Sequence, residues 1–491
     1  MFDVARVYDA VIIGAGVVGC AVARELSRFD IKTAVIEKEP DVGWGTSSRN
    51  SGVLHSGINY GPGTRRAMLS VLGNSMMDAL CSDLKVPLRR TGKLTIALDE
   101  NDLPGLEKLH EQGKANVVPG MELLDNEAMR RIQPGVEGIL GLWTPTSAII
   151  SPYGLTIALA ENARENGVDF YLSNEVTSIR KNFSGVFGIS TRDAATGEQN
   201  AIKTRTLVNS AGLRSDSVSR MLGVGGVIYP CRGEYFILDK RLEGELRTLL
   251  YPVPGPNDPG LGIHLTPTVD GNILIGPSAD YVPDGQREDY STTIPVLDIL
   301  RREGQRLLPS LGASDYIRNF SGNRPKQTPP DVGGNADFTI EETDVSGFIR
   351  LQGIESPGLT SAPAIAAEVR GMLARHLRLR EKENFVPRRS GLDCRFADLP
   401  NGEKIKLSRA CSDYGEIICR CENVTKKEVR DAIENPLGAR TLKGIKYRSR
   451  AMMGRCQGGF CLPRIMRMLR EDYAFREKYV PGLTERLRTE P

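Results

Sequence analysis

Four of the nine cysteines in this 491-residue chain stand in two short stretches near its end, CRCENVTKKEV and GRCQGGFC. They are Cys419, Cys421, Cys456 and Cys461. Four thiols placed so closely could bind a metal ion, form redox-active disulfides or hold a [2Fe–2S] cluster. A structural zinc ion usually takes cysteine pairs with more residues between them than C-x-C has. Neither stretch contains the C-x-x-C of disulfide oxidoreductases.

The other end of the chain carries a nucleotide-binding pattern. YDAVIIGAGVVGCAVARELSRFDIKTAVIEKE predicts a buried strand over Ala10–Ile13, a turn, a helix over Ala21–Phe29 and a second strand. Three glycines fit G-x-G-x-x-G, namely Gly14, Gly16 and Gly19. In that motif they form the tight turn, admit a pyrophosphate and let the helix pack on the strand. Glu37 ends the second strand, where an acid can accept hydrogen bonds from ribose hydroxyls.

Later glycine-rich segments favour a flavin over a nicotinamide cofactor. GWGTSSRNSGVLHSGINYGPGTRRA is too polar and too interrupted by glycine to be another βαβ unit. Far downstream, LVNSAGLRSD ends an apolar strand, and GFIRLQGIESPGLTSAPAIAAEVRGML predicts a strand, a glycine loop and a helix. Segments so far apart suit FAD stretched through a whole domain. A nicotinamide site would be nearly complete in the first half of a Rossmann fold.

These segments resemble the FAD-dependent oxidoreductases of the D-amino-acid oxidase and glycerol-3-phosphate dehydrogenase superfamily, in order and over nearly the entire chain. NSGVLHSGINYGPGTRRAMLSVLGN is most similar to L-2-hydroxyglutarate oxidases and to the large subunits of anaerobic glycerol-3-phosphate dehydrogenases. The resemblance implies a set of FAD-lining residues, with Val176 as a main-chain adenine contact. The set is Gly14, Gly16, Glu37, Lys38, Thr46, Ser47, Ser48, Asn50, Val176, Ala211, Gly212, Gly353, Gly358, Leu359 and Thr360.

The thiols also carry a resemblance. Their spacing, with GRCQGGFC, resembles the domain of bacterioferritin-associated ferredoxin, which implies a [2Fe–2S] cluster on the four cysteines. The large subunits named above combine a flavin domain with such a domain, whereas L-2-hydroxyglutarate oxidases lack it. A flavin takes up a hydride and can release single electrons, which a cluster carries one at a time. The resemblance therefore implies a dehydrogenase that delivers electrons to a protein acceptor or partner subunits.

The middle of the chain is expected to hold the substrate. LRRTGKLTIAL, GEYFILD and GNILIGP alternate like strands without intervening helices, which predicts an antiparallel sheet that covers the flavin and forms the pocket. His55, in VLHSG, and His264, in GIHLTPTVDGN, are the candidate bases for a substrate hydroxyl. His55 could equally hydrogen-bond the flavin or a loop carbonyl, and His264 could be an ordinary sheet residue.

A small anionic substrate needs a fixed cation. Arg324 follows an apolar strand and a glycine in FSGNRPKQTPPD, and a guanidinium can bind carboxylate or phosphate through two hydrogen bonds. In the superfamily an arginine at this type of position binds the substrate anion. Lys326 and Arg232 are further candidates. Each of the three could instead be a solvated loop charge.

The expected architecture is an α/β FAD-binding Rossmann-like domain, an α+β antiparallel-sheet substrate domain and a small C-terminal [2Fe–2S] domain. The expected boundaries are 1–80, 150–221 and 331–380 for the FAD-binding domain; 81–149 and 222–330 for the substrate domain; 381–414 for a linker; 415–470 for the [2Fe–2S] domain; and 471–491 for a C-terminal tail.

Composition adds little about partners. A net charge of +3 gives no reason to expect a nucleic-acid partner. No apolar run reaches the roughly 20 residues of a membrane-spanning helix, and the N-terminus shows no signal-peptide pattern. We expect a cytoplasmic protein with no direct membrane insertion, which partner subunits could tether to a membrane.

Three functions remain open at this point. The first is dehydrogenation of a small anionic 2-hydroxy compound, above all sn-glycerol 3-phosphate. The second is oxidation of L-2-hydroxyglutarate, another 2-hydroxy acid, or an amine or imino acid. The third is a non-catalytic electron-transfer subunit in which the cluster is the functional part. A middle region able to form a complete pocket favours the two catalytic functions over the third.

Overall fold

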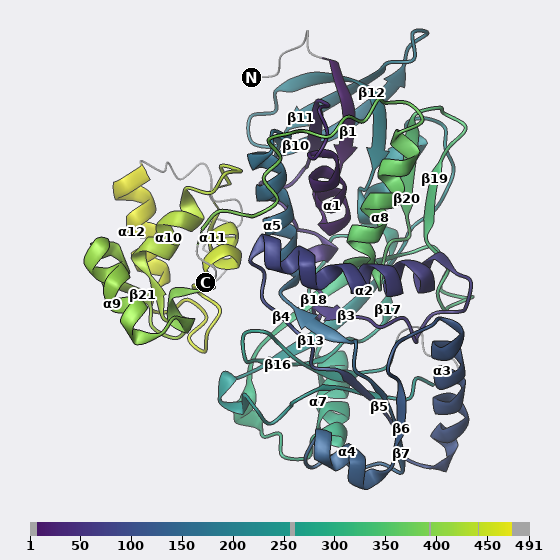
Figure 1. The fold of residues 1–491 in the computed structure, drawn as a ribbon, viewed down its shortest axis with the longest axis vertical. Helices are drawn as coiled ribbons and strands as arrows, with labels where there is room; N and C mark the ends of the chain where they lie inside the picture. Colours follow the sequence, from purple (N-terminus) through teal and green to yellow (C-terminus); the bar gives the residue numbers. More distant parts are fainter. Residues whose placement is uncertain (1–6, 256–260, 392–393, 440, 474–491) are drawn as a thin grey trace.

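The computed structural model describes residues 7–255, 261–391, 394–439 and 441–473. Two large sheets lie one above the other in Figure 1, and a small helical domain stands beside them. We call these parts the α/β domain, around the first sheet; the second domain, around the second sheet; and the C-terminal domain, which includes residues 394–439 and 441–473. Among the helices in these ranges, none is both long and apolar enough to cross a membrane.

The first sheet contains eight of the described strands. Its order is β10-β11-β12-β1-β2-β9, with β20 beside β12 and β19 on β20. The pairs β1–β12, β1–β2, β2–β9 and β12–β20 are parallel, as in a nucleotide-binding α/β fold. The bounds are β1 (Val7–Ile13), β2 (Thr33–Ile36), β9 (Asp169–Tyr171), β10 (Asn174–Lys181), β11 (Phe187–Asp193), β12 (Gln199–Asn209), β19 (Thr339–Glu342) and β20 (Phe348–Gln352).

Helices α1 (Val17–Leu26), α5 (Pro152–Glu165) and α8 (Gly358–Leu373) bury one face of this sheet. The predicted glycine turn leads directly into α1, so the helix begins four residues before the expected Ala21. Gly14 has φ +100°, and a Cβ there would lie 2.6 Å from the carbonyl oxygen of Ser210. A Cβ on Gly19 would lie 2.0 Å from the carbonyl oxygen of Gly14, so only glycine allows this helix–strand packing.

The second sheet contains nine described strands, in the order β17-β13-β16-β15-β14-β5-β7-β6, with β18 on β13. It is mostly antiparallel, as expected, but β14 and β5 pair in parallel where the two chain segments of the domain meet. The bounds are β5 (Lys93–Ala97), β6 (Glu122–Leu124), β7 (Leu140–Thr144), β13 (Tyr229–Leu238), β14 (Leu249–Pro252), β15 (His264–Pro267), β16 (Ile273–Gly276), β17 (Asp280–Tyr281) and β18 (Tyr316–Lys326).

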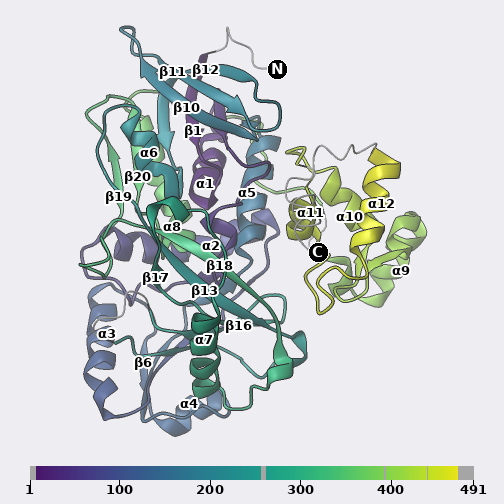
Figure 2. The ribbon, with the colours of Figure 1, turned by 180° about the vertical axis from the view of Figure 1, so that it is seen from behind.

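Helices also belong to this domain, as the expected α+β class implies. They are α3 (Leu103–Ala115), α4 (Asn126–Ile132) and α7 (Ile294–Leu307), around the lower sheet in Figures 1 and 2. The α7 helix packs closely on the sheet, because a Cβ on Gly304 would lie 2.7 Å from Ile275. The predicted strand over 88–98 is broken at Gly92, which has φ +66°.

Between the two large sheets lie α2 (Arg65–Leu84) and a small sheet of β3 (Val53–Leu54), β8 (Ala148–Ile150) and β4 (Leu88–Arg89). The α2 helix begins at Thr64, whose side chain accepts a hydrogen bond from the backbone N–H of Ala67. This layer connects the two larger domains.

The C-terminal domain has its own apolar core. Its elements are α9 (Asn401–Ala410), β21 (Ile417–Cys419), β22 (Val424–Thr425), α10 (Lys426–Ile433), α11 (Leu442–Ser449) and α12 (Leu462–Tyr473). Thr425 caps α10 in a capping box with Glu428. Of segment 381–414, expected as a linker, residues 401–410 form α9, whose side chains are all at least partly exposed. Figures 1 and 2 both place α11 next to α5 of the α/β domain.

Candidate active site and cluster site

A cavity of about 490 Å³ lies between the two large sheets. Its lining comes from segments far apart in the sequence, including the glycine turn, the segment after β2, the loop 44–55 and the start of β10. The second sheet adds side chains of β13, β14, β15 and β18, among them Tyr235, Tyr251, His264 and Arg324. The cavity therefore joins the predicted nucleotide site to the predicted substrate pocket.

The end of the cavity at the α/β domain fits a dinucleotide. The carboxylate of Glu37 accepts hydrogen bonds from the backbone N–H of Ala15, at 2.7 Å, and of Glu39, at 2.9 Å, which fix its position at the end of β2. Burial raises the pKa of Glu37 to about 7. Gly45 and Gly212 line the cavity, and a Cβ on either would meet nothing within 4 Å, so the space beside their backbones is open to a ligand.

Most of the predicted FAD residues line this cavity. They are Gly14, Gly16, Glu37, Lys38, Thr46, Ser47, Asn50, Val176, Ala211, Gly212, Gly358 and Leu359. The other candidates, Gly19, Ser48, Gly353 and Thr360, do not line it. Gly19 serves helix packing, as described above. The Thr360 hydroxyl accepts a hydrogen bond from the backbone N–H of His55 at 2.9 Å, so Thr360 holds the histidine in place.

Several buried polar atoms of residues lining this cavity have no hydrogen-bond partner in the described structure. They are Trp44 Nε1, Arg49 Nε, His55 Nδ1, Arg66 Nε, Tyr251 Oη, His264 Nε2 and one terminal nitrogen (Nη1) of Arg324. Because a buried polar atom without a partner is costly, such a group indicates a bound ligand or water. The cavity is thus apolar and aromatic with a few unpaired donors and acceptors, as ligand sites are.

Both candidate bases are neutral imidazoles in this environment. Burial, the charge of Lys93, the neighbouring His264 and the charge of Arg66 hold the pKa of His55 well below its usual value. Burial lowers the pKa of His264 to about 3. The second ring nitrogen of His55, Nε2, lies 3.2 Å from the Ser356 hydroxyl.

Two further residues on this side of the cavity were not predicted from the sequence. Tyr251 lines the cavity, and Lys93 contacts Tyr251 without lining the cavity itself. Tyr251 stacks on His264 with ring centroids 3.7 Å apart. The ammonium group of Lys93 lies 5.0 Å from the Tyr251 ring centre and donates to Asn59 at 2.8 Å. Lys93 is only 1% exposed, and burial lowers its pKa to about 7. Both residues lie on short strands whose alternation marks them only as sheet residues, so no local pattern distinguishes them.

The three predicted cations have different environments. Arg324 lines the cavity, donates one hydrogen bond to the Ser278 carbonyl at 3.0 Å and keeps its other terminal nitrogen unpaired. Lys326 is fully buried and donates to the Gly334 carbonyl and to Asn335, and its ammonium lies 3.4 Å from Glu355. It does not line the cavity.

Arg232 is also turned away from the cavity. Its guanidinium forms ion pairs with Asp289, at 3.2 Å, and Glu234, at 3.7 Å. Of the three predicted cations, Arg324 is therefore the one that lines the cavity and has an unpaired donor there.

The four C-terminal thiols form two pairs. Hydrogen bonding with Cys461 lowers the pKa of Cys419 to about 6, although burial opposes this. The side chains of Cys421 and Cys456 are likewise hydrogen-bonded to each other. Cys419 and Cys461 are buried, whereas Cys421 and Cys456 are exposed. In the described ranges no three His, Cys, Asp or Glu side chains converge as ligands of one metal ion. Two pairs match a cluster with two irons, each bound by two thiolates.

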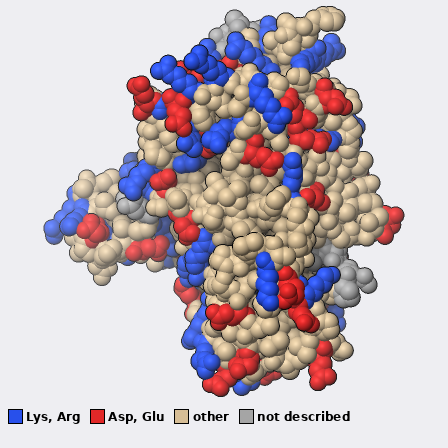
Figure 3. Space-filling view, turned by 45° about the vertical axis from the view of Figure 1, so that its right-hand side comes forward, with Lys and Arg blue, Asp and Glu red and all other residues tan. Residues whose placement is uncertain are grey.

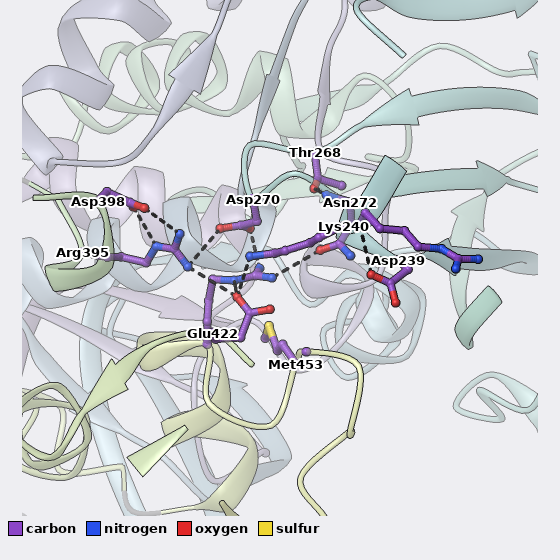
Figure 4. A network of polar contacts seen from close by, with 12 residues as sticks. Asp239, Lys240, Thr268, Asp270, Asn272, Arg395, Asp398, Glu422 and Met453 are labelled. Carbon is purple, nitrogen blue, oxygen red and sulfur yellow. Dashed lines mark hydrogen bonds and ion pairs between the residues drawn. The ribbon is translucent and has the colours of Figure 1, made fainter. Parts of the chain in front are cut away.

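A buried network of charges joins the C-terminal domain to the second domain (Figure 4). The guanidinium of Arg450 donates to Glu422 at 3.0 Å and to Asp270 at 2.5 Å. Lys240 donates to Glu422 at 2.8 Å, and Arg395 lies 3.5 Å from the same carboxylate. The Glu422 side chain is 0% exposed, and these cations hold its pKa below the usual value despite burial.

A second buried arginine joins the C-terminal domain to the α/β domain. Arg448 donates to Asp41 at 2.6 Å and to Glu161 of α5 at 2.8 Å. Tyr447 stacks on Tyr153 of α5, with ring centroids 4.7 Å apart. The C-terminal domain is therefore fixed to both larger domains by residues within and directly after α11.

Comparison with known protein families agrees with this geometry. Residues 9–372 match the family of FAD-dependent oxidoreductases (DAO). The chain belongs to this family. Residues 417–471 match the BFD-like [2Fe–2S] binding domain. The protein is thus an FAD-dependent oxidoreductase with a C-terminal [2Fe–2S] domain, as the resemblances implied.

Three known proteins show how far the similarity extends. A glycerol 3-phosphate dehydrogenase of Caloramator mitchellensis is 41% identical over 95% of this chain and 94% of its own length. L-2-hydroxyglutarate dehydrogenase of Escherichia coli K12 is 33% identical over 74% of this chain and 92% of its own length. The FAD-bound structure of L-α-glycerophosphate oxidase from Mycoplasma pneumoniae, 29% identical, superposes with a TM-score of 0.72 over 79% of this chain and 99% of that chain.

Proposed function

We propose that this enzyme oxidises sn-glycerol 3-phosphate to dihydroxyacetone phosphate and passes the electrons through its [2Fe–2S] cluster to a partner protein. The observation that carries the proposal is the unpaired donor of Arg324 in the same cavity as two neutral histidines. This arrangement can hold an anion at one end of a small molecule and accept a hydroxyl proton at the other.

Each residue of the cavity has its own role in this proposal. Arg324 binds the phosphate, because its side chain lines the cavity and one of its terminal nitrogens has no partner in the described structure. His55 takes the proton of the secondary hydroxyl, with His264 as the second candidate for that role. When bound, FAD accepts the hydride of the same carbon. The stacked pair of Tyr251 and His264 closes the pocket and helps to exclude water.

The cofactors have their own sets of residues in this proposal. The glycine turn holds the pyrophosphate at the start of α1, and Glu37 accepts hydrogen bonds from the ribose hydroxyls. The thiol pairs Cys419–Cys461 and Cys421–Cys456 each bind one iron of the cluster. We further propose that the enzyme works in the cytoplasm and meets a membrane only through partner subunits.

The coverage of the relatives favours glycerol 3-phosphate over L-2-hydroxyglutarate. The Caloramator mitchellensis dehydrogenase aligns with 95% of this chain, which includes most of the cluster domain. The L-2-hydroxyglutarate dehydrogenases align with about three quarters of it, close to the size of the flavin region alone. A carboxylate would nonetheless suit Arg324 as well as a phosphate does, so L-2-hydroxyglutarate is the second candidate.

Anaerobic bleaching of the bound flavin tests the proposal. The oxidised protein is mixed with glycerol 3-phosphate, L-2-hydroxyglutarate, other 2-hydroxy acids or amino acids, and the flavin absorbance is followed. We expect rapid bleaching by glycerol 3-phosphate alone. Bleaching by L-2-hydroxyglutarate alone supports the second candidate, and no bleaching by any compound of the panel, glycerol 3-phosphate included, contradicts a catalytic role.

A further inference from the structure

The four thiols divide into a buried pair and an exposed pair. Cys419 and Cys461 are 1% and 0% exposed, whereas Cys421 and Cys456 are on the surface. A cluster held by all four would present one edge to solvent beside the exposed pair. Electrons that leave the enzyme through the cluster can therefore leave at this edge.

An aromatic ring between two guanidinium groups borders this edge. Phe460 is 37% exposed, and its backbone N–H donates to the sulfur of Cys456. The guanidinium of Arg420 lies 4.3 Å from the centre of the Phe460 ring, and that of Arg464 lies 4.8 Å from it. Arg464 is held in place by a hydrogen bond to the Ile417 carbonyl at 3.0 Å. These contacts order a large aromatic side chain and two arginines on the protein surface.

Two further arginines, Arg455 and Arg318, contact or adjoin the exposed pair. Arg455 precedes Cys456 and is 65% exposed, with one ion pair to Asp239 at 3.5 Å. Arg318 of β18 donates to Gln457, the residue after Cys456. Glu422, beside Cys421, is fully buried and already neutralised by Arg450 and Lys240. Acidic and basic side chains are interspersed over the face of the two larger domains in Figure 3.

We propose that the edge formed by Cys421, Cys456, Arg420, Phe460 and Arg464 is the docking site of an acidic one-electron carrier protein. Aromatic residues and arginine are the types enriched at the centre of protein interfaces. Complementary charge increases the rate of encounter more than it increases affinity, which suits a carrier that must leave after each electron. This rests on the proposed function, because it takes the cluster as the electron exit.

The electron balance is simple. Each encounter oxidises the cluster by one electron and reduces the carrier by one, so two encounters remove the electron pair of one substrate molecule. An alternative role for the arginines is only to offset the negative charge of the cluster. That role would change the reduction potential of the cluster without changing how salt affects the carrier reaction.

Two haem proteins of opposite charge serve as probes, the acidic cytochrome b5 and the basic cytochrome c. The enzyme is reduced photochemically and mixed anaerobically with each, and haem reduction is followed. With cytochrome b5 we expect the second-order rate constant to fall as ionic strength rises from about 0.01 to 0.5 M, because salt screens the attraction. Arg420→Gln and Arg464→Gln should each lower it roughly tenfold at low salt and little at high salt.

Binding of the oxidised enzyme to immobilised cytochrome b5 gives a second readout without electron transfer. Both arginine variants should bind more weakly at low salt. Phe460→Ala should weaken binding while leaving the salt dependence unchanged. The control is Lys427→Gln, which removes one exposed charge from α10, paired there with Asp431. It should change neither quantity more than twofold.

Several results would overturn the proposal. One is a rate constant for cytochrome b5 that does not fall as ionic strength rises. Equally contrary is a larger rate constant for cytochrome c at low salt that falls as ionic strength rises, because a basic carrier would then be the one attracted. Another is a loss of rate fully explained by a changed cluster potential, with the salt dependence intact. Weaker binding of Arg420→Gln to vesicles of anionic lipid, with an unchanged cytochrome b5 reaction, would assign the edge to a membrane. If Arg420→Gln fails to assemble the cluster, Arg464→Gln carries the test. Photochemical reduction needs no substrate, so failure here is distinct from failure of the proposed function.

Discussion

Arg450 holds Glu422, the residue directly after Cys421, through a hydrogen bond of 3.0 Å in an environment closed to solvent. The same guanidinium binds Asp270, in the turn between β15 and β16. The hairpin of these strands begins at His264, which lines the cavity. One arginine thus connects the chain next to a proposed cluster ligand with the hairpin that lines the proposed substrate pocket.

Replacing Arg450 should release the C-terminal domain from the second domain. Removing one partner of a buried ion pair costs about 3–5 kcal/mol, since the remaining charges stay buried without compensation. For Arg450→Gln we expect unchanged flavin reduction by substrate, slower electron transfer from flavin to cluster, and faster proteolysis of the segment before α9. Stopped-flow absorbance separates the two electron-transfer steps.

Lys427→Gln is the matched control for this experiment, because it removes a charge within the same domain but not at the junction. Asp270→Asn tests the same junction from the other side, with the sequence of the C-terminal domain intact. If both junction variants keep the wild-type rate of cluster reduction while proteolysis accelerates, docking through Arg450 is not needed for electron transfer.

Arg324→Leu should weaken substrate binding without affecting the flavin. A charge-assisted hydrogen bond is worth about 1.5–3 kcal/mol, so the apparent KM for glycerol 3-phosphate should rise roughly 10- to 100-fold. FAD content should stay at the wild-type level. Arg232→Leu is the control, because Arg232 is paired with Asp289 away from the cavity. A loss of FAD in Arg324→Leu with an unchanged KM would contradict the assignment.

The acidic limb of the pH profile should report His55. A base must be deprotonated to act, and burial, with the charges of Lys93 and Arg66 and the neighbouring His264, lowers the pKa of His55. Flavin reduction should therefore persist below pH 6.5, where an ordinary histidine would already be half protonated. Lys93→Met removes one of these charges, so the pKa of His55 rises and the rate falls off at a higher pH than in the wild type.

Two further variants serve as comparisons in the same pH experiment. His55→Asn should slow flavin reduction roughly 10²–10⁴-fold and remove the acidic limb. Lys93→Arg keeps a positive charge and should keep the limb near the wild-type position. An unchanged rate in His55→Asn would show that His55 only holds the pocket together, and His264→Asn would then be the next variant to measure.

The nucleotide end of the site could be predicted because its determinants are local. Gly14, Gly16 and Glu37 lie within a single strand–helix–strand unit, and each has a steric or polar reason to be where it is. The spacing of the four cysteines is local in the same sense. One local prediction was wrong, namely the start of helix α1. The helix begins directly after the glycine turn rather than at Ala21.

The pocket wall could not be predicted, because it depends on contacts between distant segments. Lys93 and Tyr251 meet only because β5 and β14 pair in parallel, a pairing that no local pattern indicates. Lys326 lies two residues from Arg324 on the same strand, yet it is buried beside Glu355. A sequence shows a positive charge but not the carboxylate that neutralises it, so free and paired cations look alike. The Arg450 network was missed for the same reason.

Loss of one exposed thiol should separate the two halves of electron transfer. Cys456→Ser removes a proposed iron ligand, so the cluster absorbance and most of the bound iron should disappear. Bleaching of the flavin by substrate should continue, because the cavity lies in the other two domains.

The control is Cys411→Ser, which replaces a cysteine outside the two pairs and should retain the cluster. Cys461→Ser should also lose the cluster, and should in addition destabilise the C-terminal domain, since it places a hydroxyl in the apolar core. If Cys456→Ser abolishes flavin bleaching while FAD content is normal, the cluster domain supports the active site itself and is more than an exit for electrons.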